Sequence, residues 1–127
     1  MKTDDLCPCC SGKTYCKCCQ LAHLDHSKAN TAEALMRSRY SAYALHNADY
    51  LLSTTHETQR KLYCKTELLE WATKNEWIEL QIISATATVI EFKAWYRNEE
   101  QILCVHHERS TFAYEGGFWY YVDGIFL

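Results

Sequence analysis

The sequence has few of the residues that interrupt regular structure: one proline and four glycines among 127 residues. Long flexible linkers are therefore not expected. No apolar run approaches the roughly 18 residues that a membrane-spanning helix needs. The acidic, cysteine-rich N-terminus also lacks the apolar stretch of a secretory signal. We expect a cytoplasmic protein that does not interact with membranes.

An excess of charge of one sign is also lacking. Thirteen Lys and Arg face sixteen Asp and Glu, which gives a formal net charge of −3. Bulk electrostatic binding to nucleic acid is therefore not expected. Charged residues make up 23%, an ordinary share that argues against a disordered chain. The 48% of hydrophobic residues can build the core of one domain plus a small appendage.

Cysteine is abundant, and six of the eight cysteines fall within thirteen residues near the N-terminus. These six are Cys7, Cys9, Cys10, Cys16, Cys18 and Cys19. In a chain without an export signal, such a cluster favours metal binding over disulfides. The remaining two, Cys64 and Cys104, lie in apolar patterns and are predicted to be buried core thiols.

The cysteine segment contains a turn signal, Ser11-Gly12, that can bring its two ends together. Four converging thiolates suit tetrahedral zinc. The segment has few apolar side chains of its own, so we expect the metal to fold it. Three alternatives stay open: a reactive thiol patch or metal-scavenging tract without fixed structure, a metal other than zinc, and redox chemistry or competing ligation by Cys10 and Cys16.

The string C-P-C-C-S-G-K-T-Y-C-K-C-C resembles the SEC-C motif, the zinc-binding segment at the C-terminus of the SecA translocation ATPase. That pattern is C-x-C, eight residues, then Cys followed by Cys or His. Its matches here imply one zinc on Cys7, Cys9, Cys18 and Cys19. The pattern usually has Gly where this chain has Cys10, so Cys10 is expected to strain a turn. The resemblance also implies a protein partner, with the ribosome surface as one candidate.

From residue 29 onward the cysteine cluster gives way to regular patterns of apolar residues. Asn30 and Glu33 form a capping-box-like helix start. Apolar spacing predicts helices over residues 31–46, 49–53 and 57–74. Period-two patterns predict strands over residues 77–87, 88–97, 101–114 and 118–122. Short turns between strands imply an antiparallel sheet, and hence an α+β fold with helices on one sheet face.

Three further stretches resemble the YchJ family of small uncharacterised bacterial proteins. They are L-M-R-S-R-Y-S-A-Y at 35–43, E-R-S-T-F at 108–112 and W-Y-Y-V-D-G at 119–124. The resemblance implies an NTF2-like domain, a cone of helices on a curved antiparallel sheet. We therefore predict a zinc-binding segment over residues 1–28 and an NTF2-like domain over residues 29–127.

Such folds often enclose a cavity between helices and sheet. Its predicted lining residues are Arg37, Arg39, Tyr40, Glu108, Ser110 and Asp123. Two readings of Glu108 stay open. It is either a general base in a pocket or half of a buried structural ion pair with Arg37 or Arg39. The histidine pair at 106–107 is expected to be exposed, and His23 and His26 are expected on a solvated linker helix.

These features favour a zinc-stabilised binding or adaptor protein that docks a partner through its metal segment. Two alternatives remain at this point. One is a small-molecule-binding protein or enzyme that uses the cavity. The other is a thiol redox or metal-handling protein that uses Cys10 and Cys16.

Overall fold

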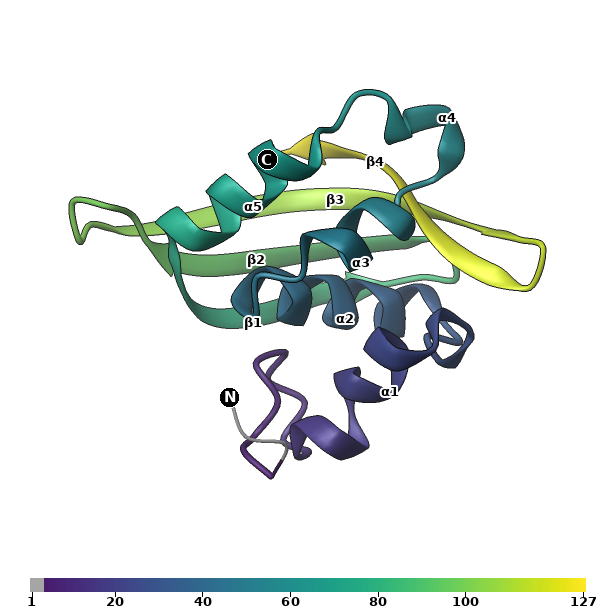
Figure 1. The fold of residues 1–127 in the computed structure, drawn as a ribbon, viewed down its shortest axis with the longest axis horizontal. Coiled ribbons are helices and arrows are strands. Elements are labelled where there is room, and N and C mark those ends of the chain that lie inside the picture. Colours follow the sequence, from purple (N-terminus) through teal and green to yellow (C-terminus); the bar gives the residue numbers. More distant parts are fainter. Residues whose placement is uncertain (1–3) are drawn as a thin grey trace.

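A computed structural model describes residues 4–127 (Figure 1). Its sheet has four antiparallel strands in the order β1-β2-β3-β4, each joined to the next by a short turn. The strands are β1 (Glu76–Ala85), β2 (Val89–Arg97), β3 (Leu103–Glu115) and β4 (Phe118–Phe126). The four strands that the sequence predicts are therefore confirmed, and the last one is longer than expected.

Five α-helices precede the sheet in the described chain. They are α1 (Cys19–Leu24), α2 (Ala32–Ala44), α3 (Ala48–Ser53), α4 (Glu57–Arg60) and α5 (Lys65–Lys74), with two short 3-10 turns at Tyr15–Lys17 and His26–Lys28. In Figure 1, α2, α3 and α5 lie over one face of the sheet. The N-terminal cysteine segment and α1 lie next to α2, far from α5. The expected α+β architecture, with helices on one sheet face, is confirmed.

The core lies between the helices and the sheet because one face of each central strand is apolar. On β2 the residues Ile90, Phe92 and Ala94 are buried, while their neighbours in sequence are partly exposed. Leu35 of α2 and Leu51 of α3 are completely buried opposite them. The alternation of buried and exposed residues along β2 thus follows the predicted period of two.

The start of α2 differs by one residue from the expected capping box. Thr31 is the N-cap, and its hydroxyl accepts a hydrogen bond from the backbone N–H of Ala34 at 2.9 Å. Glu33 does not reach back to the cap. It pairs instead with Arg37, one turn further along, at 3.0 Å.

The predicted helix over residues 57–74 is wrong as a single element. It is two helices, α4 and α5, because the chain leaves the helical conformation between Lys61 and Cys64. The N–H of His56 donates to the carbonyl of Tyr121 on β4, and Arg60 Nε donates to the carbonyl of Thr55. Cys64 then adopts an extended conformation as the N-cap of α5 and is exposed, so it is not a core thiol.

None of the described helices combines the length and the apolar character that crossing a bilayer would require.

Candidate functional site

The sulfur atoms of Cys7, Cys9, Cys18 and Cys19 lie within 4.8 Å of one another. Cys18 Sγ is 3.6 Å from Cys9 Sγ and 3.9 Å from Cys19 Sγ. Around a tetrahedral zinc with Zn–S bonds of about 2.3 Å, neighbouring sulfurs are about 3.8 Å apart. The cluster therefore has the donor type and the spacing to hold a metal ion.

A short hairpin builds this cluster. Leu6 pairs with Thr14 as an isolated bridge, and the N–H of Cys7 donates to the carbonyl of Lys13 at 2.9 Å. The chain reverses through Gly12, whose φ of 86° suits a residue without a side chain. The turn expected at Ser11-Gly12 is thus present, and it places the first cysteine pair opposite the second.

Hydroxyl groups also surround the sulfurs. Ser11 Oγ lies 3.1 Å from Cys18 Sγ, and Ser41 Oγ, from helix α2, lies 3.4 Å from Cys7 Sγ. Hydrogen bonds from Cys19 and Cys9 lower the pKa of the Cys7 thiol against the opposing effect of burial, and Ser41 lowers it further. These contacts favour the thiolate form of Cys7, and a thiolate is the form that ligates a metal.

Cys10 and Cys16 lie outside the group of four sulfurs. Cys10 has a φ of 65°, a left-handed conformation that glycine adopts most easily. The SEC-C pattern usually has glycine at this position. Its sulfur faces β1 and accepts a hydrogen bond from the N–H of Leu80 at 3.5 Å. Cys16 Sγ lies 3.7 Å from the hydroxyl of Thr14. Both thiols are free, as are the other six.

Two histidines after the cysteine cluster form hydrogen bonds to the predicted NTF2-like domain. The prediction that they lie on a solvated linker helix is therefore wrong. His23 Nε2 donates to the carbonyl of Ser38 at 2.8 Å, so its Nδ1 accepts from the Tyr15 hydroxyl at 2.6 Å. Burial lowers the pKa of His23, in keeping with this neutral ring. His26 Nε2 lies 2.6 Å from the carbonyl of Trp119 on β4.

Arg37, predicted as a pocket residue, contacts the cysteine segment instead. Its Nη1 donates to the carbonyl of Cys9 at 2.7 Å, and its Nε pairs with Glu33. The reason is its position on α2: Arg37 and Ser41 are one turn apart and face the cysteines.

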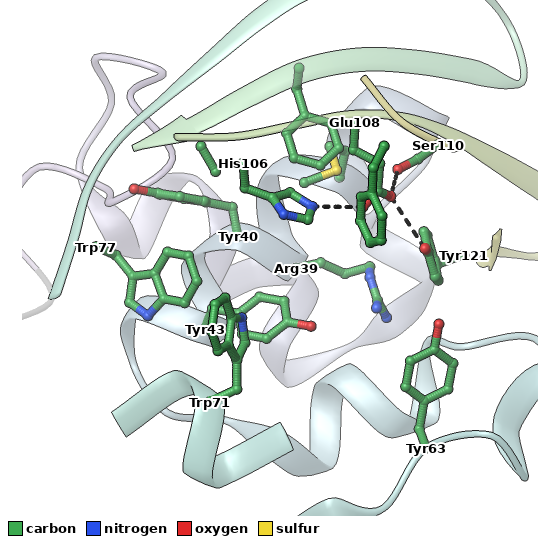
Figure 2. A pocket seen from close by; sticks show the side chains of 14 residues that line it. Arg39, Tyr40, Tyr43, Tyr63, Trp71, Trp77, His106, Glu108, Ser110 and Tyr121 are labelled. Atoms are coloured by element: carbon green, nitrogen blue, oxygen red, sulfur yellow. Dashed lines mark hydrogen bonds and ion pairs between the residues drawn. The ribbon is translucent and has the colours of Figure 1, made fainter. Parts of the chain in front are cut away.

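The opposite side of α2 lines a pocket of about 200 Å³ between the helices and the sheet. Arg39, Tyr40, Glu108 and Ser110, four of the predicted residues, line it. Figure 2 shows an aromatic wall on one side and the Glu108 carboxylate on the other, with Arg39 drawn between them. The aromatic wall consists of Tyr40, Tyr43, Trp71 and Trp77.

Glu108 is only 6% exposed, and both of its carboxylate oxygens are hydrogen-bonded. His106 Nε2 lies 2.7 Å from Oε1, while the hydroxyls of Ser110 and Tyr121 donate to Oε2, the latter at 3.2 Å. Burial alone would raise the pKa of this carboxyl. The hydrogen bonds from His106, Ser110 and Tyr121 outweigh burial and leave the pKa below its usual value, so Glu108 is ionised.

Gly124 on β4 makes room for this carboxylate. It pairs with Ser110, and a Cβ atom at this position would collide with Oε2 of Glu108. Every other amino acid at 124 would therefore force the carboxylate to move. Gly124 is thus a positioning residue for the site.

Arg39 does not form the expected ion pair with Glu108. Its Nη1 donates to the carbonyl of Leu51 at 2.8 Å and to the hydroxyl of Thr54 at 2.7 Å. Its guanidinium carbon lies 4.6 Å from the centre of the Tyr121 ring. The expectation that Glu108 faces the helix layer is correct, but the nitrogen that contacts its carboxylate belongs to His106 of its own strand.

Asp123, the last predicted pocket residue, is exposed on the other face of the sheet. The pairing explains why: Thr111 faces Asp123, but the next residue, Phe112, faces Tyr121, so Val122 has no partner. This bulge breaks the alternation that would place Tyr121 and Asp123 on one side. Tyr121 therefore turns into the pocket without Asp123.

Several pocket residues are not among those that the sequence predicts. His106, predicted to be exposed, lies two residues before Glu108 on the same strand and therefore shares its face. Tyr43 follows Arg39 by one helical turn, which was also a usable signal. The rings of Trp71 on α5 and Trp77 on β1 meet across the helix–strand junction with centres 6.0 Å apart, and neither periodicity alone predicts that contact.

Comparison with known proteins agrees with this architecture. A family model described as "YchJ, middle NTF2-like domain" matches residues 31–124. A UPF0225 protein of Haemophilus influenzae is 42% identical over 122 residues, covering 92% of this chain and 75% of the relative. Another UPF0225 protein, from Vibrio vulnificus, is 38% identical over 126 residues, covering 94% of this chain and 74% of the relative.

Two solved structures are also similar. The solution structure of a SEC-C motif containing protein from Rhodopseudomonas palustris has a TM-score of 0.83 at 37% identity and covers 95% of this chain and 98% of that one. The crystal structure of a sec-c motif containing protein from Psychrobacter arcticus has a TM-score of 0.74 at 28% identity, covering 92% and 80%. The expected NTF2-like fold with an N-terminal cysteine cluster is confirmed.

We expect Glu108→Gln to lower the free energy of unfolding by about 1–3 kcal/mol at neutral pH, because an amide cannot accept from all three donors. Thermal and denaturant unfolding measure the loss. The folded-state pKa of Glu108 is lowered, so its contribution is complete above about pH 5 and fades as the pH falls through that pKa. The difference between variant and wild type should shrink accordingly.

Glu91→Gln is the matched control for this measurement. Glu91 also pairs with a histidine, His107 at 2.9 Å, and with Arg109, but on the outer face of the sheet. It should change stability much less. Equal effects of the two substitutions would show that the buried network is not structural.

Proposed function

This chain belongs to the YchJ family, and we propose that it acts as a zinc-stabilised protein that binds a small molecule in its NTF2-like pocket. The proposal has two parts, the identity of the metal and the use of the pocket. Each part has its own support and its own test.

Zinc is favoured by the chemistry of the four thiols. Thiolates select soft or borderline ions over magnesium and calcium, and four of them leave no open position for water. Three of the cysteines, Cys7, Cys9 and Cys19, are buried. A closed, buried site of this kind is typical of a structural metal, so zinc here would stabilise the segment and take no part in a reaction.

The protein should carry about one zinc ion per chain, held by Cys7, Cys9, Cys18 and Cys19. Metal analysis of single Cys→Ser variants tests the ligand set. Cys9→Ser should lose most of the zinc. Cys10→Ser, the neighbouring control, should retain it, since Cys10 Sγ faces Leu80. Retention by Cys9→Ser with loss by Cys10→Ser would contradict the assignment.

One observation carries the small-molecule part of the proposal: an ionised carboxylate and a guanidinium line the same largely aromatic cavity. Glu108 and Arg39 are each 6% exposed and do not pair with each other. Charged groups are costly to bury, so a pocket that converges two of them is typical of a ligand site. The aromatic wall adds apolar surface for the body of a ligand.

Docking of a partner protein through the metal segment is the second candidate. A hollow beside the cysteines is lined by Lys13, Lys17 and Lys28 together with Arg37 and Glu33. The excess of positive charge there would suit an acidic partner, and the ribosome remains a candidate only through the SEC-C resemblance. The pocket is the better supported of the two, because its polar groups are buried while these lysines are exposed.

Small one-ring and two-ring aromatic fragments of anionic, cationic and neutral types test the pocket. We expect at least one type to shift the indole resonances of Trp71 and Trp77 in a saturable manner. Ala94→Leu, which fills the pocket, should abolish the shift. Ala113→Leu, on the other face of the sheet, should not. Absence of saturable shifts for every fragment type would refute the pocket as a binding site.

A further inference from the structure

Arg39 presents an unpaired edge of its guanidinium group to the pocket. Its three hydrogen bonds, to Leu51, Thr54 and Thr55, all start from Nη1. Within residues 4–127 it forms no ion pair. Every fully shielded side-chain nitrogen or oxygen in that range has a hydrogen-bond partner. Nε and Nη2 of Arg39, which form none of these bonds, are therefore not fully shielded, and Arg39 lines the cavity beside them.

Glu108 forms no hydrogen bond or ion pair with Arg39 in this arrangement. Its Oε1 is engaged by His106 and its Oε2 by Ser110 and Tyr121. The ring face of Tyr121 also lies against the guanidinium of Arg39, with the guanidinium carbon 4.6 Å from the ring centre. A cation–π contact offsets part of the cost of burying a positive charge, but it supplies no hydrogen-bond acceptor. The pocket therefore lacks one anionic acceptor beside Arg39.

The free edge of Arg39 has a defined geometry. Nε–H and the adjacent Nη2–H point in parallel and match the two oxygens of a carboxylate, which is the commonest bidentate pairing of arginine. A neutral carbonyl would fill only one of these positions. A cation at this edge would be repelled by the charge of Arg39.

The volume and the aromatic lining of the pocket limit the rest of the ligand to a small, flat group. At about 200 Å³ the pocket is smaller than the 300–1,000 Å³ typical of sites for drug-sized molecules. Trp77 packs against Tyr43 with ring centres 5.4 Å apart, and against Trp71 and Tyr40 at 6.0 Å. Figure 2 shows these rings gathered on one side of Arg39. A planar body can lie along such a wall.

We propose that the pocket binds a small planar carboxylate, with its two oxygens on Nε and Nη2 of Arg39 and its flat body against Trp77 and Tyr43. This inference rests on the proposed small-molecule function and names the ligand class of that same site. Glu108 then acts as a fixed negative wall that excludes a second acid group from the Tyr121 side.

Three probes of nearly equal size test the ligand class on the full-length, zinc-loaded protein: benzoate, benzamide and benzylamine. NMR titration follows the Nε–H resonance of Arg39 and the indole resonances of Trp71 and Trp77. Benzoate should bind about tenfold or more tightly than either of the other two. Its binding should shift the Arg39 resonance together with the indoles.

Arg39→Lys should weaken benzoate binding about tenfold, because an ammonium group cannot form the bidentate pair. Arg109→Lys, on the outer sheet face, is the control and should leave the affinity unchanged. The wild-type comparison of the three probes keeps the test decisive if Arg39→Lys folds poorly.

Benzamide or benzylamine binding as well as benzoate would overturn the carboxylate inference while leaving the pocket function in place. Equal weakening by Arg39→Lys and Arg109→Lys would overturn it as well, since benzoate would then bind elsewhere. Failure of all three probes to shift the indole resonances would count against both the inference and the proposed function.

Discussion

Helix α2 carries polar side chains on two opposite sides, and each side needs a neighbouring segment that completes their hydrogen bonds. The arrangement of the molecule depends on these two neighbours. Arg37 and Ser41 face the cysteine segment, where they contact the carbonyl of Cys9 and the sulfur of Cys7. Arg39 and Tyr40 face the sheet and line the pocket. A helix with polar groups on both sides is stable only if each side is covered by a partner that completes its hydrogen bonds.

The sheet and the cysteine segment, which pack on the two sides of α2, are held in place by different interactions. The sheet covers one side through a continuous apolar core that includes Leu35, Ile90 and Phe112. The cysteine segment covers the other, and its own buried cluster consists of Cys7, Cys9 and Cys19 with little apolar surface around them. A segment that small needs a metal to stay ordered, whereas the core of the larger part does not. We therefore expect the pocket to persist without the metal, although the segment around the cysteines would not.

Local patterns in the sequence predict most of the fold and part of each site. The cysteine spacing indicates which four thiols meet, and period-two alternation places Glu108 and Ser110 on the inner face of β3. Local patterns fail where a tertiary contact decides. The bulge at Val122 removes Asp123 from the pocket. The partner of Glu108 depends on where Arg39 finds acceptors, which only the packing of α3 reveals.

Hydrogen exchange of the zinc-loaded protein, followed by mass spectrometry before and after chelation, tests most directly whether α2 carries two separately stabilised sites. Amides between residues 4 and 24 should lose protection when the metal is removed. Amides of α2 and of the central strands β2 and β3 should keep most of theirs, because the apolar core holds them. Loss of protection throughout α2, β2 and β3 at the same chelator concentration would show that the metal segment and the pocket form one cooperative unit, which would contradict this account.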